Sequence, residues 1–134
     1  MKRTWIPNYL TYYLNLQLPR VIRSIQYRFK DSVLVYGIRC NINNMVYVGS
    51  TTDPRHRFYQ HLVTGHLSND LLQADISKYG ISQFTLYIFE VIQFPSGLNA
   101  VQKDQYLRKS EQNHIDNFPA SQLYNQRAAK STTL

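Results

Sequence analysis

The chain has 134 residues, which is enough for one domain with a hydrophobic core and too few for two. Hydrophobic residues make up 43% and aromatic residues 13% of the sequence, which excludes a disordered chain, and no apolar run of about 18 residues is present to span a bilayer. The net charge of +7 favours a polyanionic partner, and the single cysteine, Cys40, excludes an internal disulfide and a cysteine-based zinc site.

The first 31 residues form a basic, aromatic-rich extension that differs in composition from the rest of the chain. Residues 1–30 contain tyrosines, one tryptophan and several cations, and they contain no acidic residue. Three interpretations are open: a nucleic-acid-binding arm, an import presequence, or an amphipathic segment docked on the domain. As an arm, the extension would contact nucleic acid through Lys2, Arg3, Arg20, Arg23, Arg28 and Lys30.

A β-hairpin is predicted directly after this extension. β-Branched and aromatic residues flank Asn43-Asn44, a pair that accepts the positive φ of a tight turn, and the strands are expected at about Ser32–Asn41 and Met45–Ser50. Pairing around 43 and 44 would match residues whose numbers sum to 87, and a four-residue loop from 41 to 44 gives another odd sum. In either register Tyr36 and Tyr47 lie on the same face of the hairpin.

Two helices, a buried strand and a long helix are predicted to follow the hairpin. Asp53 and Pro54 are typical of a helix N-cap and first turn, and Gly65 and Gly80 are typical of helix ends. The expected elements are a helix from Pro54 to about Val63, a helix capped by Ser68 or Asn69 and ending at Tyr79, a buried strand within Ile81–Phe94, and a helix from about Leu98 to Asn117.

Two of these helices carry polar side chains that suggest a site. Arg57 and His61 are four residues apart and project from one side of the first helix. In the last helix Glu111 follows Leu107 by one turn on an apolar stripe. A carboxylate aimed at the core is costly unless it is paired or binds a cation. Glu111 is therefore either half of an ion pair with an arginine or a metal ligand.

Five motifs follow one another between about Ser32 and Gln126: Val35-Tyr36-Gly37-Ile38, Tyr47-Val48-Gly49-Ser50, Arg57 with His61, Glu111, and Tyr124-Asn125. Their order and spacing resemble the GIY-YIG nuclease superfamily, and in particular the homing endonucleases encoded by phage and fungal-organelle introns. The chain departs from the family pattern at Leu34-Val35, where the family has Gly-Ile, at His66, near a second histidine of some members, and at His114, which replaces a common aromatic residue.

The resemblance implies a fold and a set of residue roles. The fold is a small α/β (α+β) domain over residues 32–126, in which helices flank a three-stranded antiparallel sheet with the active site on one face, and residues 127–134 form a polar tail. Glu111 would bind one Mg²⁺ or Mn²⁺ ion with waters and the scissile phosphate. Tyr36 would activate the attacking water, with Arg57, His61 and the ion favouring its phenolate, and Tyr47 would position water or phosphate.

The remaining implied roles concern charge, protons and substrate contacts. Arg57 would stabilise charge on the phosphate, His61 would accept or relay a proton, and Asn125 would order the site by hydrogen bonding. Further candidate nucleic-acid contacts are Gly49, Ser50, Arg55, His66 and the six cations of the extension.

The implied function is a metal-dependent endonuclease that hydrolyses DNA and descends from intron-homing enzymes. The alternative is a module that no longer cuts and binds structured RNA or DNA within a ribonucleoprotein; a structure-selective repair nuclease of the same superfamily is less favoured. The expected partner is nucleic acid, DNA first and structured RNA second, with no membrane, and targeting comes from the basic extension or a partner chain. An intron-derived protein would reside in the mitochondrial matrix or a plastid, and otherwise in a phage-infected or bacterial cytoplasm.

Overall fold

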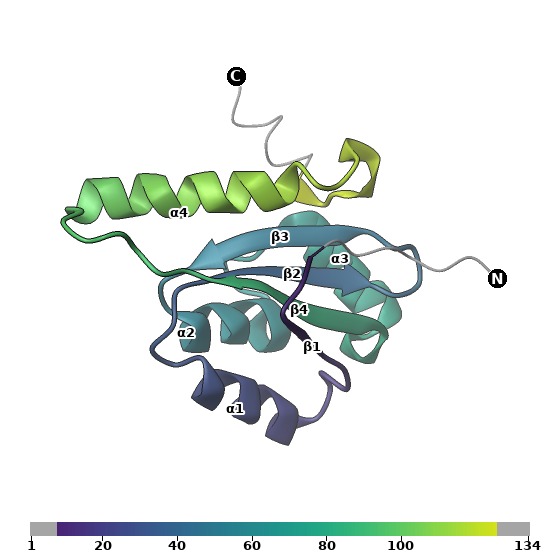
Figure 1. Cartoon of the computed structure of the whole chain (residues 1–134). Coiled ribbons are helices and arrows are strands. Elements are labelled where there is room, and N and C mark those ends of the chain that lie inside the picture. Colours follow the sequence, from purple (N-terminus) through teal and green to yellow (C-terminus); the bar gives the residue numbers. More distant parts are fainter. Residues whose placement is uncertain (1–7, 126–134) are drawn as a thin grey trace.

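The computed structural model describes residues 8–125, which form a four-stranded antiparallel sheet with helices on both faces (Figure 1). The expected α+β class is confirmed, and the sheet has one strand more than the three expected. The strand order is β1-β4-β2-β3, with β1 at Thr11–Tyr13, β2 at Leu34–Cys40, β3 at Val46–Thr51 and β4 at Phe84–Val91. The α-helices are α1 (Pro19–Arg28), α2 (Pro54–Tyr59), α3 (Asp70–Tyr79) and α4 (Ala100–Ile115).

The hairpin of β2 and β3 is closed by the four-residue loop from 41 to 44. The backbone N–H of Cys40 donates to the carbonyl of Met45 at 2.9 Å, and Ile38 lies opposite Tyr47, so paired residue numbers sum to 85. The tighter register, with a sum of 87, is therefore wrong by two residues, because Asn44 takes the positive φ (65°) at the end of a longer loop. Both sums are odd, so the prediction that Tyr36 and Tyr47 share a face is confirmed.

Alternation along the strands directs side chains into two separate cores. Even-numbered residues of β2 face α1, α2 and α3, and odd-numbered residues face α4, which lies across the other face of the sheet (Figure 1). The first core includes Leu34, Tyr36, Ile38, Cys40, Phe58 and Leu72, and the second includes Val35, Val46, Val48, Leu107 and Phe118. Groups on the two faces of the hairpin can therefore approach each other only around the outer edge of the sheet, along β3.

Residues 11–28 are an integral part of this fold. β1 pairs with β4, and α1 buries Ile22 and Ile25 in the first core together with Leu16 and Phe29. Residues 11–28 therefore agree with the interpretation of the extension as an amphipathic segment docked on the domain. The cations Arg20, Arg23, Arg28 and Lys30 remain exposed, and Lys2 and Arg3 lie outside the described residues.

Replacing Ile25 with alanine should lower the free energy of unfolding by about 2–5 kcal/mol, because the change opens a cavity in a close-packed core. Ile25 is 1% exposed, whereas Ile42 in the hairpin loop is 53% exposed. Ile42→Ala is therefore the matched control, with an expected change within about 0.5 kcal/mol. Urea denaturation measures both values, and equal stability of the two variants would contradict the docking of α1.

Caps fix the helix ends near the predicted positions, and one segment differs from the prediction. Asn69 accepts from the backbone N–H of Leu72, and Gly65 and Gly80 follow helices with positive φ values of 73° and 89°. After α2 the chain continues as a π-helix, η1 (Gln60–Thr64), and short 3₁₀ turns lie at Ile81–Gln83 and Ala120–Gln122. Among residues 8–125, no helix combines the length and hydrophobicity needed to cross a bilayer.

Candidate active site

The two motif tyrosines lie side by side on the hairpin face that carries α2. Their ring centroids are 6.3 Å apart; Tyr36 is fully buried, with its ring edge-to-face on Phe58, and Tyr47 is half-buried. Gly49 pairs with Tyr36 across the hairpin, and a Cβ at this position would lie 2.6 Å from the Tyr36 hydroxyl oxygen. A side chain at position 49 would therefore displace the hydroxyl. The glycine therefore makes room for the Tyr36 phenol.

A chain of hydrogen bonds leads from Tyr36 into the protein. The Tyr36 hydroxyl is 2.6 Å from Nε2 of His61, and Nδ1 of His61 is 2.7 Å from the hydroxyl oxygen of Ser68. The side-chain amide of Gln73 donates to the same Ser68 oxygen at 2.9 Å and to the His61 carbonyl at 2.8 Å. The imidazole is therefore held from both ring nitrogens and from its own backbone.

Burial determines the protonation states along this chain. Desolvation raises the pKa of Tyr36 well above its usual value, with a further contribution from Tyr47, so the phenol keeps its proton and donates to His61. Desolvation and then the charge of Arg57 lower the pKa of His61 to about 3, so the imidazole is neutral at physiological pH. Its proton sits on Nδ1 and is donated to Ser68, because Nε2 accepts from Tyr36. In the free protein the surroundings thus oppose the Tyr36 phenolate that we expected them to favour.

The neutral, buried His61 should make stability depend on pH in a defined window. Its pKa is about 3 in the folded protein and about 6.5 in the unfolded chain. The unfolded chain binds more protons between these values, so the free energy of unfolding falls as the pH is lowered from about 6.5 towards 3, by up to about 1.4 kcal/mol per pH unit. Urea titrations at several pH values measure the slope. For His61→Gln the free energy of unfolding should depend less steeply on pH. Identical slopes for this variant and the wild-type protein would contradict the assignment of His61 as a neutral, buried imidazole.

Arg57 is held beside the tyrosines by two hydrogen bonds from Nη1. One goes to Oε1 of Gln60 at 2.9 Å and the other to the carbonyl of Leu67 at 2.7 Å. Leu67 has a left-handed φ of 56°, which costs roughly 1–2 kcal/mol for a residue with a Cβ, and in return its carbonyl accepts from Arg57. Burial alone would lower the pKa of Arg57, and its interactions with Tyr36 and Tyr47 raise it. Arg57 and Tyr47 are the partly exposed members of this group.

Glu111 approaches this group from the other face of the sheet. α4 packs there through Leu107, and the Ser50 hydroxyl of β3 donates a short hydrogen bond to the Glu111 carboxylate. The site therefore differs from the single-face arrangement expected from the sequence, because Gly49 and Ser50 are consecutive strand residues that point to opposite faces. The edge strand β3 separates Glu111 from the tyrosines and Arg57. The negative charge of Glu111 still contributes to the raised pKa of Tyr36. Within the described residues Glu111 forms no salt bridge.

Asn125 closes part of the outer edge of β3. Its side-chain nitrogen donates to the carbonyl of Val48 at 2.7 Å, and its oxygen accepts from the N–H of Val48 at 2.9 Å. Tyr124 also donates its backbone N–H to the carbonyl of Val46. Asn125 thus positions the strand that carries Gly49 and Ser50, without a hydrogen bond to the other candidate catalytic side chains.

The sequence motifs did not identify three polar residues that support the site: Gln60, Ser68 and Gln73. Ser68 had a signal, since it was one of two candidate helix caps; Asn69 takes the cap and leaves the Ser68 hydroxyl for His61. Gln60 gave no signal, because it begins the π-helix, which changes which side chains of that segment face inward. Gln73 lies on α3 and belongs to none of the sequence motifs. The remaining predicted contacts, Arg55 and His66, are both exposed, on α2 and in the loop after η1.

Residues 32–125 match the family model described as the GIY-YIG catalytic domain. A curated relative, "Probable intron-encoded endonuclease 1" of Neurospora crassa, is 30% identical over 120 residues, which cover 90% of this chain. The aligned region covers 38% of that relative, so the chain spans well under half of the relative's length. No solved structure gives a significant match. All six candidate catalytic residues fall within the matched region.

Proposed function

The chain belongs to the GIY-YIG family, and on this basis we propose that it is a metal-dependent endonuclease that hydrolyses phosphodiester bonds of DNA. The observation that carries the proposal is the buried chain from Tyr36 through His61 to Ser68, set beside the partly exposed Arg57 and Tyr47. Hydrolysis of a phosphodiester needs a route for the proton of the attacking water and a cation for the charge on the phosphate. These residues supply both.

The proposed proton transfer avoids a buried phenolate. A water that enters beside Tyr47 gives its proton to the Tyr36 oxygen while Tyr36 passes its own proton to Nε2 of His61, so no charge accumulates on the phenol. Arg57 binds the scissile phosphate and stabilises its growing charge. The phosphate also offsets the Arg57 charge that lowers the pKa of His61, so substrate binding makes His61 a better proton acceptor.

Glu111 is the residue that would hold the metal ion. Residues 8–125 contain no group of three or more His, Cys, Asp or Glu side chains that could enclose an ion. One half-buried carboxylate, oriented by Ser50, fits Mg²⁺ or Mn²⁺, because such ions keep several waters and share phosphate oxygens. The ion would supply positive charge at the scissile phosphate and the leaving oxygen.

Incubation of the purified protein with supercoiled plasmid DNA and Mg²⁺ tests the proposal. Conversion to nicked or linear DNA that EDTA stops is the expected result, and protein carrying Glu111→Ala, purified in parallel, controls for contaminating nucleases. Binding of plasmid or structured RNA without any cutting would instead select the non-cutting module of a ribonucleoprotein.

We also infer descent from intron-homing enzymes and an organellar location, in the mitochondrial matrix or a plastid. The support is the Neurospora crassa relative, whose description reads as a probable intron-encoded endonuclease. Imaging a fluorescently tagged chain in fungal cells against a mitochondrial marker tests the location, and an even distribution through the cytoplasm would count against it.

A further inference from the structure

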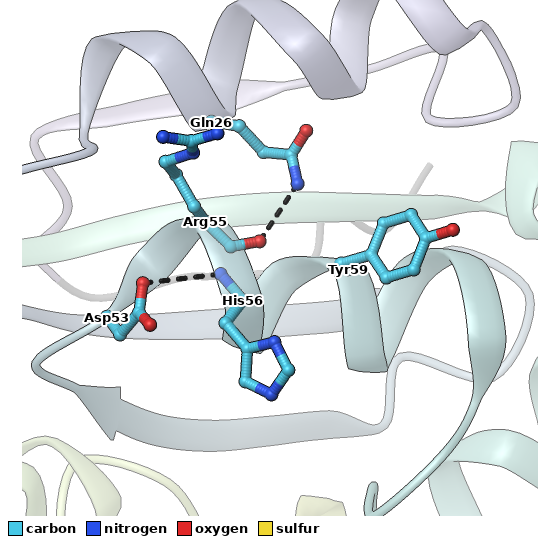
Figure 2. A pocket seen from close by; sticks show the side chains of 5 residues that line it. All are labelled: Gln26, Asp53, Arg55, His56 and Tyr59. Carbon is cyan, nitrogen blue, oxygen red and sulfur yellow. Dashed lines mark hydrogen bonds between the residues drawn. The ribbon is translucent and has the colours of Figure 1, made fainter.

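A pocket of about 360 Å³ lies between α1 and α2 (Figure 2). Gln26 of α1 lines one side, and Asp53, Arg55, His56 and Tyr59 line the other. Nε2 of Gln26 donates to the Arg55 carbonyl at 2.8 Å and so joins the two helices. α1 precedes residues 32–125, so the pocket combines a helix of the family region with a segment outside it.

Helix α2 connects this pocket to the active site. Its inner side buries Phe58 against Tyr36. With 3.6 residues per turn, Arg57 projects to one flank, towards the tyrosines, while Arg55 and Tyr59 project together to the other flank. His56 is exposed between the two flanks. A strand whose scissile phosphate contacts Arg57 can therefore cross over His56 and reach the pocket.

The pocket lining offers a partner for each part of a nucleotide. Arg55 and His56 are exposed donors for phosphate oxygens, and Tyr59, 47% exposed, presents a ring on which a base can stack. Gln26 and Asp53 add amide and carboxylate oxygens that can accept from the edge of a base. The volume is at the lower end of the range of ligand pockets, about 300–1,000 Å³, which fits one nucleotide and not a duplex.

The exposed face of α1 continues the same surface away from the active site. Arg23 and Tyr27 of α1 are four residues apart, Lys30 lies in the turn after the helix, and all three are exposed. The Lys30 ammonium lies 4.8 Å from the Tyr27 ring centroid. This row of cations and an aromatic ring is the composition that binds a single-stranded backbone with stacked bases.

We propose that this pocket binds one nucleotide of the substrate strand, a few nucleotides from the scissile phosphate. Tyr59 stacks on its base and Arg55 contacts its phosphate, while His56 contacts the strand between this nucleotide and Arg57 (Figure 2). Helix α1 carries the strand onward past Arg23. The proposal rests on the proposed function, because the strand is the one whose phosphate contacts Arg57. The docked extension would then bind nucleic acid as a folded helix and not as a free arm.

An NMR titration of the full chain with deoxyadenosine 5′-monophosphate tests the pocket independently of cleavage. Saturable shifts are expected at Gln26, Arg55, His56 and Tyr59. Tyr59→Ala should weaken nucleotide binding by about 5- to 100-fold, because base stacking on the ring is lost, and Tyr59→Phe should retain it. The matched control is Tyr106→Ala, at a 38% exposed tyrosine on α4, which should leave the affinity unchanged.

Two outcomes would overturn the inference: no saturable shift at these residues, or the same shifts with inorganic phosphate alone. Arg55→Ala provides a second variant at an exposed position, with Arg108→Ala on α4 as its control. Plasmid cleavage is measured separately. Cleavage without nucleotide binding in the pocket would overturn this inference and leave the proposed function standing, whereas nucleotide binding without cleavage would support the pocket and count against the enzyme.

Discussion

The Glu111→Ala variant should cut plasmid DNA at least about 100-fold more slowly than the wild-type protein, with DNA affinity within about twofold of wild type. The change removes the carboxylate that would hold the metal ion and removes no positive charge. Nicking assays across a range of Mg²⁺ concentrations measure the first effect, and fluorescence anisotropy with labelled duplex in EDTA measures the second.

A matched control is available on the same face of the sheet. Glu90 pairs with His114 of α4 at 2.8 Å and lies on β4, with β2 between it and Ser50. Glu90→Gln therefore also removes one carboxylate near α4 and should leave cleavage largely intact. Ser50→Ala should give an intermediate result, with a higher Mg²⁺ requirement, because Glu111 loses the hydroxyl that orients it. Near wild-type cutting by Glu111→Ala would show that the metal assignment is wrong.

The Tyr36→Phe variant should lose about 10²- to 10⁴-fold in cleavage rate, because the proton of the attacking water loses its acceptor. The substitution keeps the ring that packs on Phe58 and removes a single oxygen from a core position, so the fold should persist. Single-turnover cleavage measures the loss. The ¹⁵N chemical shifts of the His61 imidazole report whether Nε2 still receives a hydrogen bond.

Tyr124 provides the control for this second experiment. It is also a buried tyrosine of the first core, and its hydroxyl donates to Asp75 at 2.7 Å, outside the chain from Tyr36 to Ser68. Tyr124→Phe should therefore change the free energy of unfolding and leave the cleavage rate nearly unchanged. Equal cleavage by the Tyr36 and Tyr124 variants would refute the proposed proton route.

Local signals in the sequence were sufficient to predict most helices and strands and the shared face of Tyr36 and Tyr47. The hairpin, both helix-ending glycines and the capped helix before Tyr79 follow from residue types that have direct backbone consequences. The shared face of Tyr36 and Tyr47 survived an error of two residues in the register, because side-chain direction in a strand depends on parity alone. The position of Tyr36 relative to Glu111 could not be predicted from strand parity, since it depends on which face of the sheet α4 covers.

The extension shows how composition can conceal a periodic signal. Its cations and tyrosines left an arm, a presequence and a docked segment open together. Pro19 at the first helical position and Ile22, Ile25 and Phe29 at spacings of three and four residues are typical of the docked amphipathic helix. The hydrogen bonds that hold His61 and Arg57 could not be predicted in the same way. They depend on a π-helix and on the left-handed backbone of Leu67, neither of which follows from residue type.

The edge of β3 also bears on how copies of the protein behave towards one another. An edge strand presents unpaired backbone groups with which a strand of a second molecule can pair. Natural proteins prevent this pairing by covering or shortening their edge strands. Here the Asn125 side chain and the Tyr124 backbone occupy the outward groups of Val48 and Val46, while the opposite edge of the sheet, β1, is only three residues long. Removing the Asn125 amide would uncover Val48 and should favour concentration-dependent aggregation through intermolecular β-pairing.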